Sequence, residues 1–565
     1  MKRFLFTLII SMIACSGYAQ TPVFVGPRGN SANDPANGVY VSPSGNDQTG
    51  NGSIDRPYKS INFALGKVSS GATIILRGGT YREGRRVRVN KSNITIKSAK
   101  GEWAIIDLTT YDAGNQEHSG VEFYAEDIED TNVPRGVVKN CKLQSVEVKG
   151  GFYAVCFETQ WEWGKGIRDG ASNNIVEDCI LHHSTNDCVK IKPGCDNNTI
   201  RYCEIHHSGQ SYINHVNFTT GKCNSEGIDN VNGDKMHVHN NYIHDICSNG
   251  IYAKGGAMDA LIEYNIIDRT YGTGIALGFD TSPQFFDLTV NPKYYENING
   301  IVRNNLVMNT GWEGIGLYAS KDAQVYNNTI INATGYGTAT TTSPEPVVRC
   351  AIYFGIVTQD YGNPNGCPPN INPTIHHNLI SQPSSKVSEK MVEIRYVKPG
   401  DVYATAIPGI SGKPTMNYNC YYASGKSATF TNNCPPEVKN ISLSAWKTHI
   451  GGEANSIEVN PSLGADYMPT NSQCAGMGIT APLKINDGTG APKAPLSETF
   501  ASISNGVLYI NNPFTETVQG YSITGAILFN IQKQEGNVSF SMNQPIGTVV
   551  FINGSSGWTK KLIVR

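Results

Sequence analysis

A segment that repeats itself fills the middle of the chain, from residue 173 to residue 333. It contains variants of one pattern, such as "VHNNYIHDICSNGIYAKGG", "IEYNIIDRTYGTGIALG" and "VRNNLVMNTGWEGIGLY". One polar or thiol position recurs at intervals of 24, 38, 24, 40 and 23 residues, at Cys179, Cys203, Asn241, Asn265, Asn305 and Asn328. A fixed period of this length predicts a solenoid, with coils of about 24 residues and longer insertions in two of them.

The repeated segments are short, rich in β-branched residues and alternating, as in Ile251/Ala253 and Ile275/Leu277. This pattern is typical of strands, and no helical run lies between them. Strands of neighbouring coils must then pair in parallel and bury their aliphatic residues in stacks. We predict an all-β fold, a right-handed parallel β-helix. The recurrent asparagine should form a ladder at one turn, with Cys141, Cys179 and Cys203 in its place in the early coils.

Further segments flank the repeats. Residues 1–20 have a basic start and an apolar run, which predicts a signal peptide, although Cys15 could instead be a lipoprotein cysteine. Residues 21–93 should cap the solenoid, with a helix opened by Pro57 and a strand at 73–76. We expect the β-helix to span 94–480, a Pro/Gly linker 481–500, and a small β-sandwich-like domain 501–565.

The composition restricts the partners. A net charge of −2 argues against nucleic acid binding. No apolar run after the signal approaches membrane length, so we expect a soluble, monomeric mature protein. In an oxidising compartment, Cys420 with Cys434 and Cys350 with Cys367 could form disulfides.

Charged residues gather in one place when the coils are aligned. Rungs of a parallel sheet lie about 4.8 Å apart, which brings the following residues into a patch three rungs wide: Asp187, Lys190, Lys192, Glu226, Asp229 and Lys254. Asn249 and Tyr252 share the same columns. The nearby insertions carry Trp161 and Trp163, which could stack on sugar rings or pack the loops onto the body.

This combination suits β-elimination from a uronic-acid polysaccharide. The reaction removes the proton next to a carboxylate, so that carboxylate must be neutralised and a base must be near. A hard cation such as Ca²⁺, held by Asp187, Glu226 and Asp229, could do the first task. A lysine with a lowered pKa could do the second. The alternative is a solvated cluster of salt bridges without a catalytic role.

Three motifs resemble family 9 pectate lyases. "TNDCVKIK" at 185–192 is similar to their calcium-site strand, and "SEGIDN" at 225–230 to their downstream acidic strand, with Ser225 where the family has its first acid. "NGIYAKGG" at 249–256 resembles the strand with their catalytic lysine. The resemblance implies calcium ligation by Asp187, Glu226 and Asp229, and Lys254 as the base.

Two other enzyme families show a weaker resemblance. "DCVKIK" followed by "NNTIRYCEI" is similar to family 6 alginate and chondroitin lyases, which implies Lys192 as the base. Their catalytic arginine would fall near residues 213–215, where no arginine occurs. Lys190 is a further candidate base. "NDC" and "EGID" also resemble family 28 polygalacturonases, which are inverting hydrolases, but their other motifs are missing.

The histidines form two columns, His182, His206 and His244, then His183, His207 and Asp245. They could bind zinc or act as an acid/base pair. We expect a turn ladder of rings instead, with His207, His215 and His244 as candidate proton donors.

The closing "GWTKKLIVR" resembles the C-terminal sorting domain of the Bacteroidetes type IX secretion system. It implies export by that machinery to the medium or the cell surface. The sequence therefore predicts an exported, calcium-assisted lyase of an acidic polysaccharide. An inverting glycoside hydrolase and a non-catalytic, glycan-binding β-helix protein are the alternatives.

Overall fold

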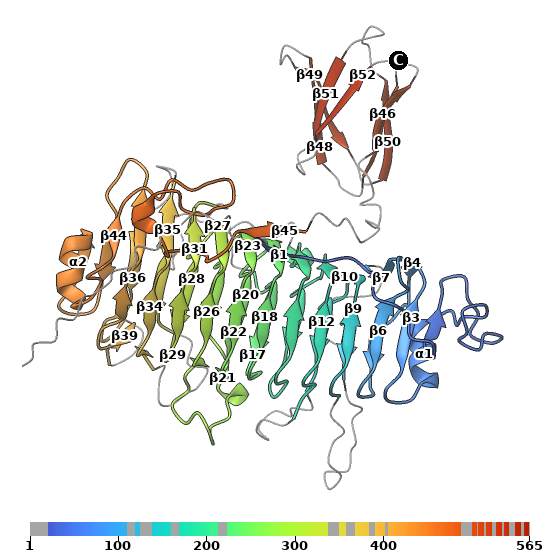
Figure 1. Ribbon diagram of the computed structural model, residues 1–565, viewed down its shortest axis with the longest axis horizontal. Helices are drawn as coiled ribbons and strands as arrows, with labels where there is room; N and C mark the ends of the chain where they lie inside the picture. Colours follow the sequence, from blue (N-terminus) through green and yellow to red (C-terminus); the bar gives the residue numbers. More distant parts are fainter. Residues whose placement is uncertain are drawn as a thin grey trace, which may run out of the picture. The chain divides into compact units, whose positions relative to one another are not determined.

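The computed structural model describes residues 21–109, 119–124, 138–159, 169–212, 223–336, 350–357, 368–383, 390–401 and 405–486, and seven strands between residues 500 and 563. The chain divides into two compact units, Met1–Gly490 and Ala491–Arg565. Within the described residues, the first unit is built from three long sheets, and each coil adds one strand to each sheet (Figure 1). It is the right-handed parallel β-helix that the repeat predicted.

Sheet I comprises β2 (Val39–Val41), β3 (Thr73–Leu76), β6 (Thr95–Ser98), β9 (Lys142–Gln144), β12 (Ile175–Glu177), β15 (Thr199–Arg201), β18 (His237–His239), β22 (Leu261–Glu263), β26 (Ile301–Arg303), β30 (Gln324–Tyr326), β34 (Thr374–His376) and β40 (Thr415–Asn417).

Sheet II comprises β4 (Gly79–Tyr81), β7 (Ala104–Leu108), β10 (Val146–Gly150), β13 (Ile180–His182), β16 (Glu204–His206), β19 (Tyr242–Ile246), β23 (Ile266–Thr270), β27 (Leu306–Thr310), β31 (Thr329–Ile331), β35 (Leu379–Gln382), β41 (Cys420–Ala423) and β44 (Ile457–Glu458).

Sheet III comprises β5 (Val87–Val89), β8 (Val121–Phe123), β11 (Val155–Phe157), β14 (Val189–Ile191), β17 (Ile228–Val231), β20 (Ile251–Lys254), β24 (Ile275–Leu277), β28 (Ile315–Tyr318), β32 (Ile352–Gly355), β36 (Lys390–Ile394), β42 (Thr429–Asn432) and β43 (Val438–Ile441), the last of which is antiparallel. A short fourth sheet comprises β21 (Ala257–Met258), β25 (Asn297–Ile298), β29 (Ser320–Lys321), β33 (Asn370–Ile371) and β39 (Ile410–Ser411).

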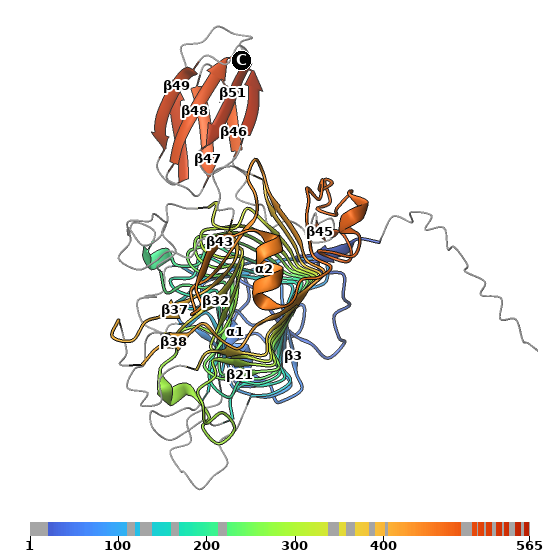
Figure 2. The same ribbon diagram turned by 90° about the vertical axis from the view of Figure 1, so that its left-hand side faces the viewer.

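Figure 2 shows the three sheets viewed along the stack, around a common interior. The core lies there, and aliphatic residues of successive rungs stack in register within it. On sheet III, for example, Val189 pairs with Ile228, which pairs with Ile251. All three are fully buried. Because side chains alternate along a strand, the residues between these positions face outward. The sheet register therefore determines which polar side chains meet on the outside.

The predicted asparagine ladder is confirmed. The backbone N–H and the side-chain Nδ2 of Asn265 both donate to Oδ1 of Asn305, at 3.0 Å each. The same two groups of Asn305 donate to Oδ1 of Asn328. The ladder continues through Asn378 to Asn419. In the early coils, cysteine thiols take the same position and donate to backbone carbonyls, as Cys203 does to Arg201.

A helix covers each end of the stack. α1 (Ile61–Lys67) buries Ile61, Ala64 and Leu65 against the first coils, which confirms the predicted helix. Pro57 does not open it, because the helix begins four residues later, after Ser60. α2 (Leu443–Ile450) buries Leu443, Trp446 and Ile450 at the other end. α2 lies within the range 94–480 that was predicted as β-helix, and the sequence did not indicate it, because a helix of two turns leaves too short an apolar periodicity. Stacking also begins before residue 94, since β2 and β3 already pair as the first rungs of sheet I.

The described part of the chain contains one disulfide, between Cys223 and Cys247. The expected pair of Cys420 and Cys434 is wrong, because Cys420 lies on sheet II and Cys434 follows β42 of sheet III. Both are free thiols, as is Cys350. Cys367, its expected partner, lies outside the described residues.

The second unit is formed by antiparallel strands in two sheets. These are β46 (Phe500–Ser504), β47 (Val507–Asn512) and β50 (Gly536–Ser541), and β48 (Glu516–Ser522), β49 (Ile527–Lys533), β51 (Val549–Gly554) and β52 (Thr559–Ile563). Among the helices of the described segments, none has the length and apolarity that crossing a membrane requires.

Candidate active site

Three carboxylates converge on the outer face of sheet III. Asp187 precedes β14, Glu226 precedes β17, and Asp229 lies within β17. One carboxylate oxygen from each lies within 4.8 Å of the others. All three residues are buried, with exposed fractions of 2% or less. Oδ1 of Asp187 accepts a hydrogen bond of 2.9 Å from the backbone N–H of Glu226, which ties the two rungs together. The structure therefore brings together the three acids that the sequence singled out.

Two lysines neutralise this cluster in part. Lys190 is directly opposite Asp229 in the strand register, and its Nζ donates to Oδ2 of Asp229. The same Nζ lies 3.4 Å from Asp187. Nζ of Lys254, on the next rung, lies 3.8 Å from Oδ1 of Asp229. Lys254 is thus held beside the acids, and its side chain remains 10% exposed.

Lys192 does not join them. Its Nζ pairs with Glu158, 2.5 Å away, after β11 on the preceding rung. Glu158 was not singled out from the sequence because it adjoins an insertion and has no counterpart in the aligned columns. Since this ion pair turns Lys192 toward earlier coils, the structure does not place it with the carboxylates as the pattern suggested.

Burial and the neighbouring charges give the three acids different pKa values. Burial raises the pKa of Asp187, and it raises that of Glu226 well above the usual range, with the charges of Asp187 and Asp229 adding to the effect. For Asp229, the cations Lys190 and Lys254 outweigh burial, so its pKa is lowered. The pKa of Lys190 is raised well above normal, since Asp229 and Asp187 outweigh burial. A lysine held in this way keeps its proton and is a poor general base.

Asn249 and Tyr252 extend the site by one rung. Nδ2 of Asn249 donates to Oε1 of Glu226 at 3.2 Å and also contacts the Tyr252 hydroxyl. The Tyr252 ring lies under the Lys254 ammonium, with Nζ 4.6 Å from its centroid. Phe279 stacks on the same ring. These contacts fix the direction of the lysine through cation–π attraction and packing.

Glu296 is a residue of the site that the sequence did not indicate. Its Oε2 accepts from the backbone N–H of Gly255 at 2.7 Å and from Thr281 Oγ1 at 2.7 Å. It therefore holds the turn that follows Lys254. Burial raises its pKa to about 8. It ends a long insertion, and no periodic signal marks such a position.

The donor set fits a hard cation. Oε2 of Glu226 and Oδ1 of Asp229 are buried and have no hydrogen-bond partner within the described residues. Buried carboxylate oxygens without partners are costly, and Ca²⁺ prefers such oxygen ligands. When all three acids are ionised, they carry one more charge than Lys190 and Lys254 compensate, and a bound cation would favour that ionised form over the protonated Glu226 that burial favours.

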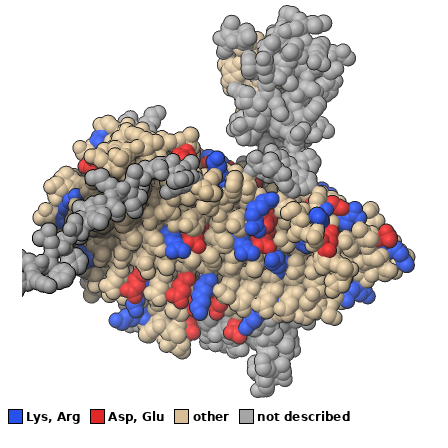
Figure 3. Space-filling model, viewed as in Figure 1, with Lys and Arg blue, Asp and Glu red and all other residues tan. Residues whose placement is uncertain are grey.

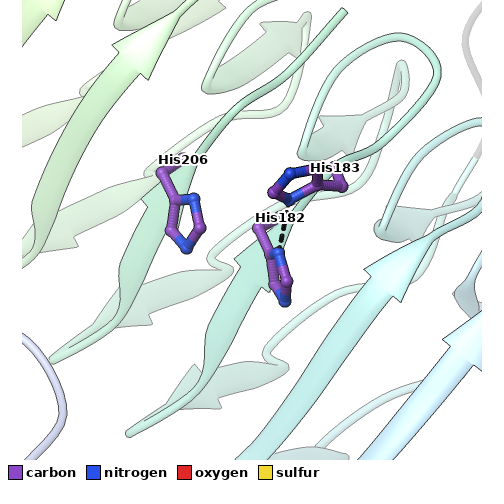
Figure 4. A group of neighbouring side chains, drawn as sticks. All are labelled: His182, His183 and His206. Carbon is purple, nitrogen blue, oxygen red and sulfur yellow. Dashed lines mark hydrogen bonds between the residues drawn. The ribbon is translucent and has the colours of Figure 1, made fainter. Parts of the chain in front are cut away.

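The histidines form a separate stack on sheet II (Figure 4). His182, His206 and His244 are in register, and neighbouring rings stack at 4.7 and 5.0 Å. Nδ1 of His182 lies 2.6 Å from Nδ1 of His183, and Nδ1 of His206 lies 2.7 Å from Nδ1 of His207.

The Nδ1 atoms of these rings are engaged in hydrogen bonds. Nε2 of His182 meets Glu147 at 3.1 Å, so His182 donates there and accepts at Nδ1 from His183. Although nitrogens of His182, His183 and His206 come close enough for a metal ion, the closest pair already shares a proton. The geometry is that of a turn ladder. His207 stacks on His183 at 4.9 Å in this ladder and is not a neighbour of the carboxylates.

Three candidate residues lie outside the described residues: Trp161, Trp163 and His215. Their predicted roles stay predictions. Elsewhere, charged residues pair locally, as Glu177 does with Lys142 and Arg201 on sheet I. Figure 3 likewise shows basic and acidic side chains next to one another on the face in view.

Comparisons with known proteins agree with this fold. Residues 39–217 match the family described as Pel9A-like, right handed beta helix region. Pectate lyase PEL9 of Emericella nidulans is 30% identical over 161 aligned positions, and the match covers 24% of this chain and 37% of that lyase. The matched part is thus little more than a third of the relative's length.

Solved structures similar to part of the chain include pectate lyase Pel9A, at 16% identity and a TM-score of 0.41, covering 64% of this chain and 78% of that one. The A-module of the Azotobacter vinelandii mannuronan C-5 epimerase AlgE4 has 13% identity and a TM-score of 0.37, covering 67% and 94%. In sequence, residues 39–217 are thus similar to the Pel9A-like β-helix region, and part of the chain is similar to a pectate lyase. The family match includes Asp187 and ends before Glu226, Asp229 and Lys254.

Proposed function

We propose that the protein is a polysaccharide lyase that cleaves a uronic-acid polysaccharide by β-elimination. The observation that carries the proposal is the convergence of three buried carboxylates with Lys254, one rung away and 3.8 Å from Asp229. The similarity of part of the chain to a pectate lyase supports the same reaction class.

Each group has a defined task. Lys254, in its neutral amine form, takes the proton from the carbon next to the uronate carboxylate. The bond from the neighbouring carbon to the glycosidic oxygen breaks as a double bond forms, and the leaving oxygen takes up a proton from water. Asp187, Glu226 and Asp229 would hold Ca²⁺, which supplies positive charge to the substrate carboxylate. Tyr252, Phe279 and Glu296 keep Lys254 and its turn in place. Lys190 stays protonated and balances Asp229.

The carboxylate spacing disfavours the hydrolase alternative. An inverting hydrolase needs two carboxyl groups about 6.5–9.5 Å apart to admit a water. Here oxygens of all three acids lie within 4.8 Å of one another. A glycan-binding role remains the second alternative, and it requires no base.

The test is to incubate the purified protein with polygalacturonate, alginate and glycosaminoglycans, in Ca²⁺ and then in EDTA. We expect a Ca²⁺-dependent rise in the ultraviolet absorbance of an unsaturated uronate. New reducing ends without that absorbance would mean hydrolysis, and neither signal on any substrate would favour binding.

Lysine variants assign the base. Lys254→Met should lower kcat by at least about 100-fold, the usual contribution of a general base. Lys142→Met, which removes an ion pair on sheet I, is the matched control and should keep full activity. Lys192→Met distinguishes the two lyase resemblances, because a loss of activity there rather than at Lys254 would contradict the assignment.

We also propose that residues 1–20 direct export and that residues 501–565 act as a sorting domain. The basic and apolar start and the closing "GWTKKLIVR" support this. Expression in a Bacteroidetes host should place the protein outside the cell, and deletion of 501–565 should retain it.

A further inference from the structure

A segment after the last coil runs back along the β-helix. We call residues 472–486 the C-terminal strap; it begins with a 3-10 turn, Ser472–Cys474, and ends in β45 (Leu483–Ile485). Its Gly478 N–H donates to the carbonyl of His377 at 2.7 Å, and its Thr480 N–H donates to Oδ1 of Asn304 at 3.1 Å. The strap thus passes from late coils to earlier ones.

The strap ends beside the first strand that the structure describes. β45 pairs in parallel with β1 (Val23–Val25), and Asn486 donates to the carbonyls of Val25 and Gly26. Together these segments cover an apolar surface of sheet II, where Ile479 and Leu483 pack with Ile266, Leu306 and Met308. The strap therefore covers part of the outer face of sheet II.

Two thiols meet where the strap begins. Cys420 on β41 and Cys474 in the 3-10 turn are fully buried, and their Sγ atoms lie 3.1 Å apart. Leu379 and Met477 pack around them. Both side chains therefore already point at one another among buried apolar side chains. By contrast, Cys434 is partly exposed, and its Sγ contacts the carbonyl of Arg395.

We propose that Cys420 and Cys474 are a site of disulfide formation that fastens the strap to the last coils. The chain already holds one disulfide, Cys223–Cys247. The new bond would close a loop between residues 54 positions apart. Closing a long loop restricts the unfolded chain, so the bond should stabilise the docked strap.

The reaction needs a disulfide oxidant, either a small molecule such as oxidised glutathione or an exchange protein. One thiolate attacks a sulfur of the oxidant and releases one thiol, and the second thiolate then displaces the other half. In total the two cysteines lose two protons and two electrons, and the oxidant becomes two thiols. Burial raises the pKa of both thiols. Exchange is therefore slow once the strap has docked, and the bond should form during folding.

The experiment uses the full chain, unfolded under reductant and refolded in a glutathione redox buffer. Free thiols are alkylated under denaturing conditions, and the protein is digested without reductant for mass spectrometry. We expect one linked pair of peptides that contains Cys420 and Cys474, and an alkylated Cys434. Alkylation of both Cys420 and Cys474 while Cys223–Cys247 is linked, or a link from either to Cys434, would overturn the proposal.

Variants add a readout of the strap itself. Cys474→Ser should leave Cys420 alkylated and should increase the rate of limited proteolysis within residues 472–486 severalfold. Reduction of the wild-type protein should produce the same increase. Cys434→Ser is the matched control and should change neither. If reduction left the cleavage rate of the linked protein unchanged, the bond would not fasten the strap.

Discussion

Asp229 is the residue on which the charge balance of the site depends. It pairs with Lys190 and Lys254 at once, and all three groups are largely withdrawn from water. A buried ion pair contributes little net stability, but removal of one partner leaves the other charge uncompensated. The carboxylate therefore has a structural role beside its proposed role as a ligand.

Asp229→Asn should lower the free energy of unfolding by about 3–5 kcal/mol, since the amide keeps the volume and removes the charge that neutralises two buried ammonium groups. Denaturant unfolding in EDTA measures this effect without a contribution from metal. Asp55→Asn, at an exposed position, is the control and should change the value by no more than about 0.5 kcal/mol. A loss below about 1 kcal/mol for Asp229→Asn would mean that the lysines are solvated.

At the scale of elements, the asparagine ladder holds one turn of every middle coil. The Asn305 amide donates to the carbonyls of Ile262 and Arg303 and accepts from Asn265. Asn305→Ala removes the partner of these groups in the core and should lower the free energy of unfolding by at least about 1–3 kcal/mol, the cost of leaving one buried group unpaired.

Asn305→Cys is the matched variant. Thiols in the early coils donate to the equivalent carbonyls, as Cys203 does to Arg201 and Val176. We therefore expect Asn305→Cys to be less destabilising than Asn305→Ala in thermal unfolding. Equal losses would show that the ladder depends on the amide acceptor alone.

The histidine stack should make the fold sensitive to acid. Burial lowers the pKa of His207 to about 4 and that of His183 to about 2, whereas an unfolded histidine titrates near about 6.5. Below about pH 6.5 these histidines are protonated in the unfolded chain but remain neutral in the folded chain. The contribution is complete above about pH 6.5, and it is lost as pH falls to about 4 for His207 and to about 2 for His183.

Each such group should reduce the free energy of unfolding by about 1.4 kcal/mol per pH unit within its window. His207→Asn should flatten the profile between pH 6.5 and 4, because asparagine also adopts the left-handed backbone that His207 has. His377→Asn makes the same change outside this stack. An unchanged slope in His207→Asn, measured by urea unfolding at several pH values, would contradict the assignment.

At the scale of the whole molecule, the repeat predicts the fold and the columns, because the register of a parallel β-helix follows from the spacing of buried residues. Asp187, Glu226, Asp229 and Lys254 could therefore be grouped from sequence. Contacts made by insertions could not, since Glu158, Phe279 and Glu296 follow no period. The proximity of Cys474 to Cys420 could not be predicted either, because the strap returns to a coil that is far from it in sequence.

The solenoid architecture also predicts which coils a bound metal ion should stabilise. Each coil contacts only its neighbours, so stability is a sum of local terms and a ligand protects the coils that hold it. If Ca²⁺ binds the three carboxylates, Ca²⁺ at 100 times its Kd should stabilise the folded state by about 2.7 kcal/mol. Hydrogen exchange should show the protection in β14, β17 and β20 and their flanking turns, with little change near α1 or α2.

Glu226→Gln should remove most of this protection while leaving the metal-free exchange pattern intact, because the amide can still pair with Asn249. Mg²⁺ is the matched ion, and its preference for a small octahedral site predicts weaker protection. Protection that appears in Glu226→Gln as in the wild type, or that appears evenly along the stack, would place the ion elsewhere. Lys254 would then act beside the three carboxylates without a metal ion between them, and the enzyme should remain active in EDTA.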